Sequence, residues 1–331
     1  MKPIKKEHLR RILVRAPNWL GDAIMCLPAI KALSRTIRPD ELRVMAVSGL
    51  GDLFDRYKFI TDVLHFKKEN STAAHSMLAD ANYDAIFLFT NSFRSSMDAM
   101  KTGCPVRVGY GGNFRGPLLT HPVGKTHGVH MVDYYLNLVN PFWGGVFSQN
   151  SDFPILPGEA RFAAAIEGLN GAVAIPLGAK YGTAKCWPHK NLKSFIKLIL
   201  NRSQRRIVLF GTAAERLQAE ALEGAGKGRV INLVGATSIG QMAAVMGQCD
   251  WVVANDSGPL HVAGAVGVKT IGLFGPTDYR RTAPLAETVQ IITKDAKCAP
   301  CMKRECPKDH RCMKNISAEE IYDIIAKHAE T

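Results

Sequence analysis

A carboxylate follows a glycine in the stretch RAPNWLGDAIMCLPAIKAL, residues 15–33, directly after the short apolar run 11–15. The run has the composition of a buried strand, and residues 23–36 have the period of a helix. Asp22 therefore stands at a strand-to-helix turn. It can stabilise the N-terminus of that helix, or it can act as a general base toward a hydroxyl within hydrogen-bond reach. Taken alone, Asp22 favours the capping role. The choice between a cap and a general base depends on the other motifs of the chain.

A second turn, VVANDSGPLHVAGA at 252–265, has the pattern of a strand that ends in polar residues and continues as a helix. Unpaired backbone N–H groups and the helix dipole suit such a turn to a phosphate. Gly258 permits close approach to the backbone, and Pro259 fits a first helical turn. The alternative is a structural turn capped by Asp256 or Ser257, and the local pattern gives the two interpretations equal weight.

Two further turns carry polar groups that fit a nucleotide. The loop PLGAKYGTAKCWPHKN, 176–191, holds Lys180 and Lys185 among small residues, where lysines suit a pyrophosphate. A solvated loop with incidental lysines is the alternative. In LFGTAAERL, 209–217, Glu215 stands at a helix start, where it either accepts ribose hydroxyls or is stabilised by the helix dipole.

Several common nucleotide-binding patterns are absent from the sequence. VGKT at 123–126 does not end a P-loop, because Leu119 occupies the position of the required first glycine. No G-x-G-x-x-G follows the run 11–15, and no Asp-x-Asp pair occurs anywhere. The last absence argues against a carboxylate-held metal on a nucleotide sugar. Charge on a leaving diphosphate then has to be stabilised by lysines and helix N-termini.

The elements that must position these turns alternate along the whole chain. We expect strands at 11–15, 43–47, 63–66, 85–89, 106–109, 172–177, 206–210, 230–233, 251–254 and 270–274, with helices that include 23–36, 71–81, 189–202, 214–224, 238–248, 258–266 and 317–328. The strands are continuous apolar runs, which is typical of parallel sheets buried on both faces. A segment rich in proline and glycine, 141–158, separates two such halves. The sequence therefore predicts an α/β protein with two doubly wound, Rossmann-like domains, 1–155 and 156–331, that face each other across a cleft.

Composition narrows the classes of partner. The 331 residues include 42 Lys and Arg against 29 Asp and Glu, a net charge of +13 that favours an anionic partner. Aromatic residues make up only 8% and are not interleaved with the basic ones, so we expect no nucleic-acid partner. No apolar run approaches the roughly 18 residues of a membrane span, and charged residues interrupt any signal-peptide core. We expect a cytoplasmic protein.

Five sequence blocks occur together in one order, and their combination resembles the heptosyltransferases of glycosyltransferase family 9. The blocks are NWLGDAIMCLPAIKAL, TNSFRSS, PLGAKYGTAKCWP, VLFGTAAE and NDSGPLHVAGAVG with the LFGPT that follows it. They extend from about residue 12 to 277 and so cover most of the chain. The resemblance implies a GT-B fold and an inverting transfer of heptose from ADP-heptose to the inner core of lipopolysaccharide. It implies no metal or other cofactor for catalysis, and a peripheral position at the cytoplasmic face of the inner membrane.

The resemblance also assigns roles to residues that match the family's motifs. Asp22 matches the aspartate that serves as general base. Lys185 matches a lysine at the donor phosphates, Asp256 an aspartate near the heptose, and Glu215, less securely, a glutamate at the ribose. The expected donor-binding residues are Lys180, Thr183, Lys185, Glu215, Asp256, Ser257, Gly258 and His261. Pro259 and Cys186 depart from the residue types usual in the family, which affects the expected substrate detail more than the reaction class.

The acceptor is harder to read from the residues. Within TNSFRSS, 90–96, Ser92 and Arg94 are candidate acceptor-binding residues, with a structural strand-to-helix turn as an equal alternative. Another sugar or a protein hydroxyl as acceptor remains open. A nucleotide-sugar epimerase of the same architecture, or a basic nucleic-acid-binding module, is a further alternative from a different class.

Four of the eight cysteines crowd into 15 residues: Cys298, Cys301, Cys306 and Cys312, with His310 among them. Four thiolates at such short spacing can hold a zinc ion tetrahedrally, although the spacing is not that of a standard zinc finger. We expect either a structural zinc site or a disulfide here, with a set of reduced thiols as the alternative. Seven Lys and Arg against three acidic residues at 294–314 also suit an anionic lipid surface or acceptor phosphates.

Overall fold

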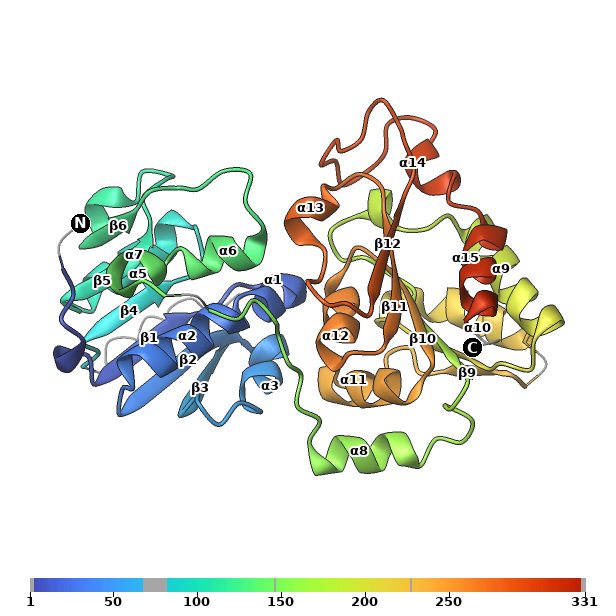
Figure 1. Ribbon diagram of the computed structural model, residues 1–331, viewed down its shortest axis with the longest axis horizontal. Helices are drawn as coiled ribbons and strands as arrows, with labels where there is room; N and C mark the ends of the chain where they lie inside the picture. Colours follow the sequence, from blue (N-terminus) through green and yellow to red (C-terminus); the bar gives the residue numbers. More distant parts are fainter. Residues whose placement is uncertain (1–2, 68–81, 146, 227, 329–331) are drawn as a thin grey trace. The chain divides into compact units, whose positions relative to one another are not determined.

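The computed structural model describes residues 3–67, 82–145, 147–226 and 228–328 (Figure 1). The chain forms two compact units, Met1–Ser151 and Asp152–Thr331. The division falls after Ser151, where the sequence suggested a boundary after residue 155. The helix expected at 71–81 lies outside the described residues.

The first unit contains a six-stranded parallel sheet. Its central strands are short runs of Val, Ile, Leu and Phe that are buried on both faces, which is the burial expected for a doubly wound sheet. The strands are β1 (Arg11–Arg15), β2 (Glu41–Val47), β3 (Asp62–Phe66), β4 (Ala85–Leu88), β5 (Val106–Tyr110) and β6 (His121–Val123). The helices are α1 (Leu20–Met25), α2 (Leu27–Ile37), α3 (Gly51–Phe54), α5 (Phe93–Lys101), α6 (Met131–Leu136) and α7 (Asn140–Trp143).

The second unit contains a second six-stranded parallel sheet. Its strands are β7 (Val173–Pro176), β8 (Ile207–Phe210), β9 (Val230–Asn232), β10 (Trp251–Asn255), β11 (Lys269–Phe274) and β12 (Val289–Thr293). Its helices are α8 (Pro157–Ala164), α9 (His189–Arg202), α10 (Arg216–Gly224), α11 (Ile239–Gln248), α12 (Gly258–Val266), α13 (Tyr279–Thr282), α14 (Arg311–Lys314) and α15 (Ala318–Lys327). Helix α12 ends at Gly267, which adopts the left-handed conformation of a helix C-terminus at φ 85°.

The two sheets have the same strand order. The first runs β3-β2-β1-β4-β5-β6, and the second, read from its other edge, runs β9-β8-β7-β10-β11-β12. Both are the Rossmann order, in which the direction of winding reverses between the first and fourth strands. Ligands of such sheets bind outside the carboxyl ends of the strands at that reversal. In the first unit this is the edge beyond β1 and β4, and in the second it is the edge beyond β7 and β10.

All ten expected strands occur, and two further strands, β6 and β12, were not expected. Strand β6 has only three residues with Pro122 at its centre, which is tolerated because β6 is an edge strand. Strand β12 is an edge strand of the second sheet, and exposed and buried positions are mixed along its sequence VQIIT. Neither strand is a continuous apolar run. Because such runs are the sequence pattern that predicts central parallel strands, the sequence predicts neither β6 nor β12.

The C-terminal segment is part of the second unit's core. Helix α15 packs against α9 (Figure 1), and Ile321 and Ile325 join the buried cluster around Phe195 and Ile199. The expected cap of this helix is present, because Ser317 Oγ accepts from the backbone N–H of Glu320 at 3.1 Å. The Glu320 carboxylate is paired with Lys294 at 2.8 Å.

Across the ranges that the structure describes, no helix combines the length and the apolar character needed to cross a bilayer.

Helix α10 offers a matched test of the core. Leu222 is 2% exposed and packs in the apolar cluster of the second unit, whereas Leu217 on the same helix is 81% exposed. We expect Leu222→Ala to lower the free energy of unfolding by about 2–5 kcal/mol, because it leaves a cavity. Leu217→Ala should change it by no more than about 0.5 kcal/mol. Urea unfolding of both variants measures the difference, and equal effects would contradict the assigned packing.

Candidate active site

A short ion pair at the second sheet's carboxyl edge joins Lys185 to Asp256. Lys185 Nζ lies 2.5 Å from Asp256 Oδ2, with the two side chains 13% and 4% exposed. The hydroxyl of Thr277 donates to the same carboxylate oxygen at 2.5 Å. A buried carboxylate needs such partners, since leaving its charge unpaired costs several kcal/mol. The structure thus brings together the loop after β7, the turn after β10 and the turn after β11.

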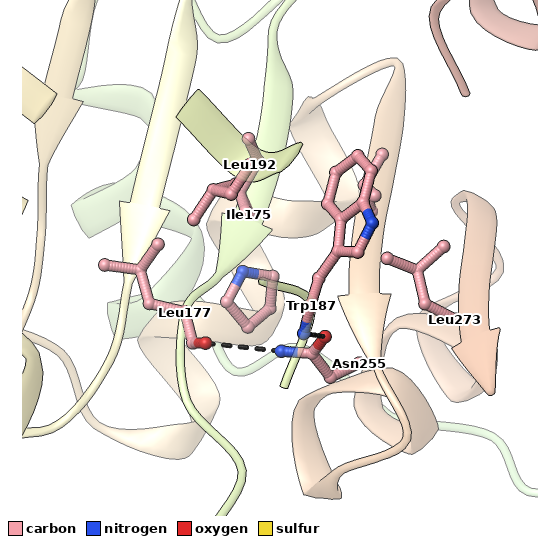
Figure 2. A pocket seen from close by; sticks show the side chains of 8 residues that line it. Ile175, Leu177, Trp187, Leu192, Asn255 and Leu273 are labelled. Atoms are coloured by element: carbon pink, nitrogen blue, oxygen red, sulfur yellow. Dashed lines mark hydrogen bonds between the residues drawn. The ribbon is translucent and has the colours of Figure 1, made fainter. Parts of the chain in front are cut away.

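Asn255 holds the first two of these segments in place. Its side-chain oxygen accepts from the backbone N–H of Trp187 at 2.8 Å, and its amide nitrogen donates to the backbone oxygen of Leu177 at 3.2 Å. Figure 2 shows the amide turned toward both groups at the edge of a small apolar hollow. The hollow is lined by Ile175, Pro176, Leu177, Trp187, Leu192, Val253, Asn255 and Leu273. Asn255 therefore spans the sheet's reversal point between β7 and β10.

The turn after β10 leads into α12, as the sequence predicts. Ser257 is the N-cap residue, Gly258 begins the helix and Pro259 follows it. The hydroxyl of Ser257 is buried and has no hydrogen-bond partner in the structure. A buried hydroxyl without a partner at a helix N-terminus is a group that a bound anion can satisfy. His261 is 4% exposed, inside the helix's buried face.

Two cations lie over one aromatic ring beside the ion pair. Lys185 Nζ is 4.7 Å from the centroid of the Tyr181 ring, and the guanidinium carbon of Arg304 is 5.3 Å from the same centroid. Cations over the face of a tyrosine are stabilised by the ring's quadrupole. The Tyr181 ring thus holds two positive charges, and one of them, Lys185, also pairs with Asp256 just before α12.

Arg304 belongs to the cysteine-rich segment, residues 298–312, which makes hydrogen bonds to the loop that carries Lys185. Tyr181 Oη donates to the carbonyl of Met302 at 2.9 Å, and the N–H of Ala184 donates to the carbonyl of Arg304 at 2.9 Å. The ring Nε2 of His310 donates to the carbonyl of Ala184 at 2.7 Å. Gly182 is required at this contact, because an added Cβ would lie 2.3 Å from the Arg304 oxygen.

The four clustered cysteines are free thiols in the structure. Burial raises the pKa of Cys312, and the neighbouring thiols Cys306, Cys298 and Cys301 raise it further. Within the described ranges, no group of three or more His, Cys, Asp or Glu side chains is arranged to hold a metal ion. The structural zinc stays a prediction that this arrangement does not support.

The remaining expected donor residues have other surroundings. Glu215 accepts from both the backbone N–H and the hydroxyl of Thr212 at 2.7 Å, so it closes a capping box at its own helix. It also packs against Gly178, where an added Cβ would lie 2.4 Å from Oε1. Lys180 and Thr183 are exposed on the loop that carries Lys185. The capping interpretation of Glu215 is therefore what the structure displays, and a ribose contact stays a prediction.

In the first unit, Asp22 lies beyond the carboxyl end of β1. It is the third residue of α1, whose N-cap is Trp19, and it is half-buried. The hydroxyl of Tyr135 donates to its Oδ1 at 3.1 Å. Asp22 is thus a first-turn residue rather than the N-cap, and a side chain from α6 engages its carboxylate.

The candidate acceptor residues lie beyond the carboxyl end of β4. Ser92 is the N-cap of α5, and its hydroxyl accepts from the N–H of Ser95 at 3.2 Å. Arg94 is exposed, and its Nε lies 3.9 Å from Asp98 one turn on. The structural interpretation accounts for Ser92 as a cap, and neither residue's expected contact with an acceptor is tested by this geometry.

Several residues at these edges were not singled out from the sequence. Thr277 lies in the LFGPT block, whose position after an apolar run was the available signal. Tyr135 carries no local signal, since its partner Asp22 is 113 residues away. Tyr181 and Arg304 meet only because the C-terminal segment folds back onto the second sheet.

Comparison with known proteins identifies the family to which the chain belongs. A model of "Glycosyltransferase family 9 (heptosyltransferase)" matches residues 72–311. The chain belongs to glycosyltransferase family 9. It is therefore a glycosyltransferase, and the sequence resemblance described above is confirmed.

Individual members of family 9 match over most of their length. A lipooligosaccharide heptosyltransferase 2 of Campylobacter jejuni is 27% identical, covering 96% of this chain and 98% of that protein. A lipopolysaccharide heptosyltransferase 1 of Pseudomonas aeruginosa is 30% identical over 89% of this chain and 87% of that protein. The structure of Escherichia coli ADP-heptose lps heptosyltransferase II matches with a TM-score of 0.78, at 22% identity, over 97% of this chain and all of that one. The fold is thus the two-sheet GT-B fold of family 9, as expected.

The Lys185–Asp256 pair gives a stability test within this family 9 member. We expect Lys185→Met to lower the free energy of unfolding by about 3–5 kcal/mol, because it leaves a buried carboxylate without its cation. The exposed Lys193 on α9 is the control, and Lys193→Met should cost no more than about 0.5 kcal/mol.

Adding Asp256→Leu to Lys185→Met removes the unpaired charge and should recover most of the loss. Urea unfolding measures all three variants. A Lys185→Met protein as stable as the wild type would show that the pair does not hold this edge together.

Proposed function

We propose that this chain transfers heptose from ADP-heptose to the inner core of lipopolysaccharide, with inversion, as a heptosyltransferase of type II. The full-length match to proteins that bear this name supports the substrates. The observation that carries the donor assignment is the largely buried side chain of Lys185, paired with Asp256 just before α12, where Ser257 has an unpartnered hydroxyl. A lysine, a ring-held arginine and a helix N-terminus together fit the charge of a nucleoside diphosphate.

In this proposal the second unit binds the donor. Lys185 and the N-terminus of α12 at Ser257–His261 stabilise the diphosphate as it leaves, and Asp256 lies near the heptose. Lys180 and Thr183 reach the phosphates from the same exposed loop. Glu215 meets the ribose, for which its capping bonds to Thr212 have to be shared. No metal is required, in keeping with the absence of an Asp-x-Asp pair from the sequence.

The first unit binds the acceptor, and Asp22 is the general base. The acceptor hydroxyl attacks the anomeric carbon as its proton passes to the Asp22 carboxylate. The bond between that carbon and the phosphate oxygen breaks, and ADP leaves with the electron pair. Ser92 and Arg94 lie beyond β4 at the same reversal of the first sheet and are the proposed acceptor contacts. A carboxylate that is a weak base at neutral pH can still take the proton late in the transition state.

We place this reaction at the cytoplasmic face of the inner membrane, with the protein peripherally bound. The net charge of +13 supports attraction to an anionic surface. The basic stretch 294–314 is a proposed part of that contact. A different core sugar as acceptor is the second candidate, since the 30% identical relative is a heptosyltransferase 1.

The first test is ADP release from ADP-heptose by the purified protein. We expect release that depends on an inner-core lipopolysaccharide truncated after its first heptose. Core truncated before the first heptose, and no acceptor, are the two controls. Release only with the heptose-free core would move the proposal to the type I acceptor. Failure to bind ADP-heptose, measured by calorimetry, would contradict the donor.

The base is tested by Asp22→Asn, which keeps the shape of the side chain but cannot take a proton. We expect kcat to fall by about 100-fold or more, the usual size of a general-base contribution, with ADP-heptose affinity unchanged. Asp40→Asn, at an exposed carboxylate of the same unit, is the matched control and should retain full activity. An Asp22→Asn enzyme with most of its activity would show that Asp22 is structural.

A further inference from the structure

The contact between Asp22 and Tyr135 joins a half-buried carboxylate to a buried hydroxyl-bearing side chain. Tyr135 is 3% exposed, and its hydroxyl reaches Asp22 Oδ1 from α6, a helix that packs against both α1 and α2. The partner residues lie 113 positions apart in the sequence. Helix α6 therefore fixes where the hydroxyl stands, and the hydroxyl fixes one oxygen of the carboxylate.

Two buried titratable side chains next to the carboxylate, Tyr135 and Cys26, stay protonated at physiological pH. Burial, and then the charge of Asp22, raise the pKa of Tyr135 well above its usual range, so its hydroxyl keeps the proton and donates it. Burial and Asp22 likewise raise the pKa of Cys26, which follows α1, and its thiol stays protonated. Tyr134 is the third titratable group, and it adds to the raised pKa of Tyr135.

Helix α6 also holds the turn after β4. The hydroxyl of Tyr134 accepts from Asn91 Nδ2 at 2.8 Å, and the rings of Tyr134 and Tyr135 meet edge to face at 5.7 Å. Tyr110 stacks on Tyr134 with ring centroids 4.1 Å apart, and its hydroxyl donates to the Tyr134 carbonyl. One pair of neighbouring tyrosines thus contacts Asp22 on one side and the 90–96 turn on the other.

We propose that Tyr135 is the positioning residue of Asp22: its hydroxyl donates to one carboxylate oxygen and fixes the orientation in which Asp22 meets the acceptor hydroxyl. Tyr134, on the same helix α6, is hydrogen-bonded to Asn91 in the 90–96 turn, which carries the proposed acceptor contacts. This inference rests on the proposed function, in which Asp22 is the general base. A carboxylate offers about four acceptor positions, so one bond to Tyr135 is compatible with proton uptake from a substrate.

Orientation matters because proton transfer requires a narrow geometry. A displacement of about 1 Å at a reacting group can cost about 100-fold in rate. The bond also favours the ionised carboxylate, the form that can act as a base. Loss of the Tyr135 hydroxyl should therefore lower kcat and move the acidic limb of its pH profile to higher pH.

The test compares Tyr135→Phe with Tyr110→Phe in the full-length protein. Both tyrosines are buried, and both hydroxyls donate one hydrogen bond, but that of Tyr110 donates to a backbone carbonyl of α6 instead of Asp22. We expect Tyr135→Phe to lower kcat by about 10- to 100-fold, with the KM for ADP-heptose unchanged and the acidic limb at higher pH. Tyr110→Phe should keep both, at a comparable thermal unfolding temperature.

A second variant guards against a folding defect. 3-Fluorotyrosine at position 135 keeps the ring and the hydroxyl but makes the phenol a stronger donor. It should retain activity, with the acidic limb at lower pH than in the wild type. Wild-type kcat and profile in Tyr135→Phe, or equal losses in both phenylalanine variants, would overturn the proposal.

Carbon-13 NMR of labelled aspartate separates this inference from the proposed function. The carboxyl signal of Asp22, assigned by its loss in Asp22→Asn, should titrate at higher pH in Tyr135→Phe than in the wild type or Tyr110→Phe. This readout needs no turnover. An unchanged titration overturns the role of Tyr135 even in an active enzyme. A shifted titration without acceptor-dependent ADP release supports the bond and contradicts the proposed function.

Discussion

The buried Asp256 carboxylate imposes the main constraint on the second unit. Its charge is tolerable only because Lys185 and Thr277 reach the same oxygen, and they come from two different turns. Asn255, one residue earlier, ties the Lys185 loop to the end of β7 through Trp187 and Leu177. The requirement to pair one charge thus organises three loops around the start of α12, where an anion can bind.

The same topology, used twice, explains why the candidate residues gather where they do. Each sheet reverses its winding between its first and fourth strands, and the loops there cannot be covered by crossover helices. Asp22 and the 90–96 turn follow β1 and β4, and the Lys185 loop and the Asp256 turn follow β7 and β10. A fold duplicated in this way supplies two separate edges, so a base and a diphosphate site can be built independently.

Much of this was readable from the sequence because the information is local. Central strands are continuous apolar runs, and Asp22, Lys185 and Asp256 all stand at turns that follow such runs. The edge strands β6 and β12 are not predicted from the sequence, because their solvent-facing positions interrupt the apolar run. The contact of Tyr135 with Asp22 is not predicted for a different reason. Its hydrogen bond to Asp22 is a contact formed across the fold, and no periodicity or spacing in the sequence encodes which side chain reaches a given carboxylate.

The cysteine-rich segment contacts the loop that carries Lys185 without using its thiols. Its thiols are the obvious feature, yet the carbonyls of Met302 and Arg304 and the ring of His310 make hydrogen bonds to the loop that carries Lys185. Those bonds hold the loop at Tyr181 and Ala184, on either side of a glycine that leaves room for the approach. Because the segment continues into α15 and the core, the position of Lys185 depends on the last part of the chain as much as on its own loop. A change that loosens the segment should therefore displace Lys185, and with it the proposed donor site, even when every thiol is retained.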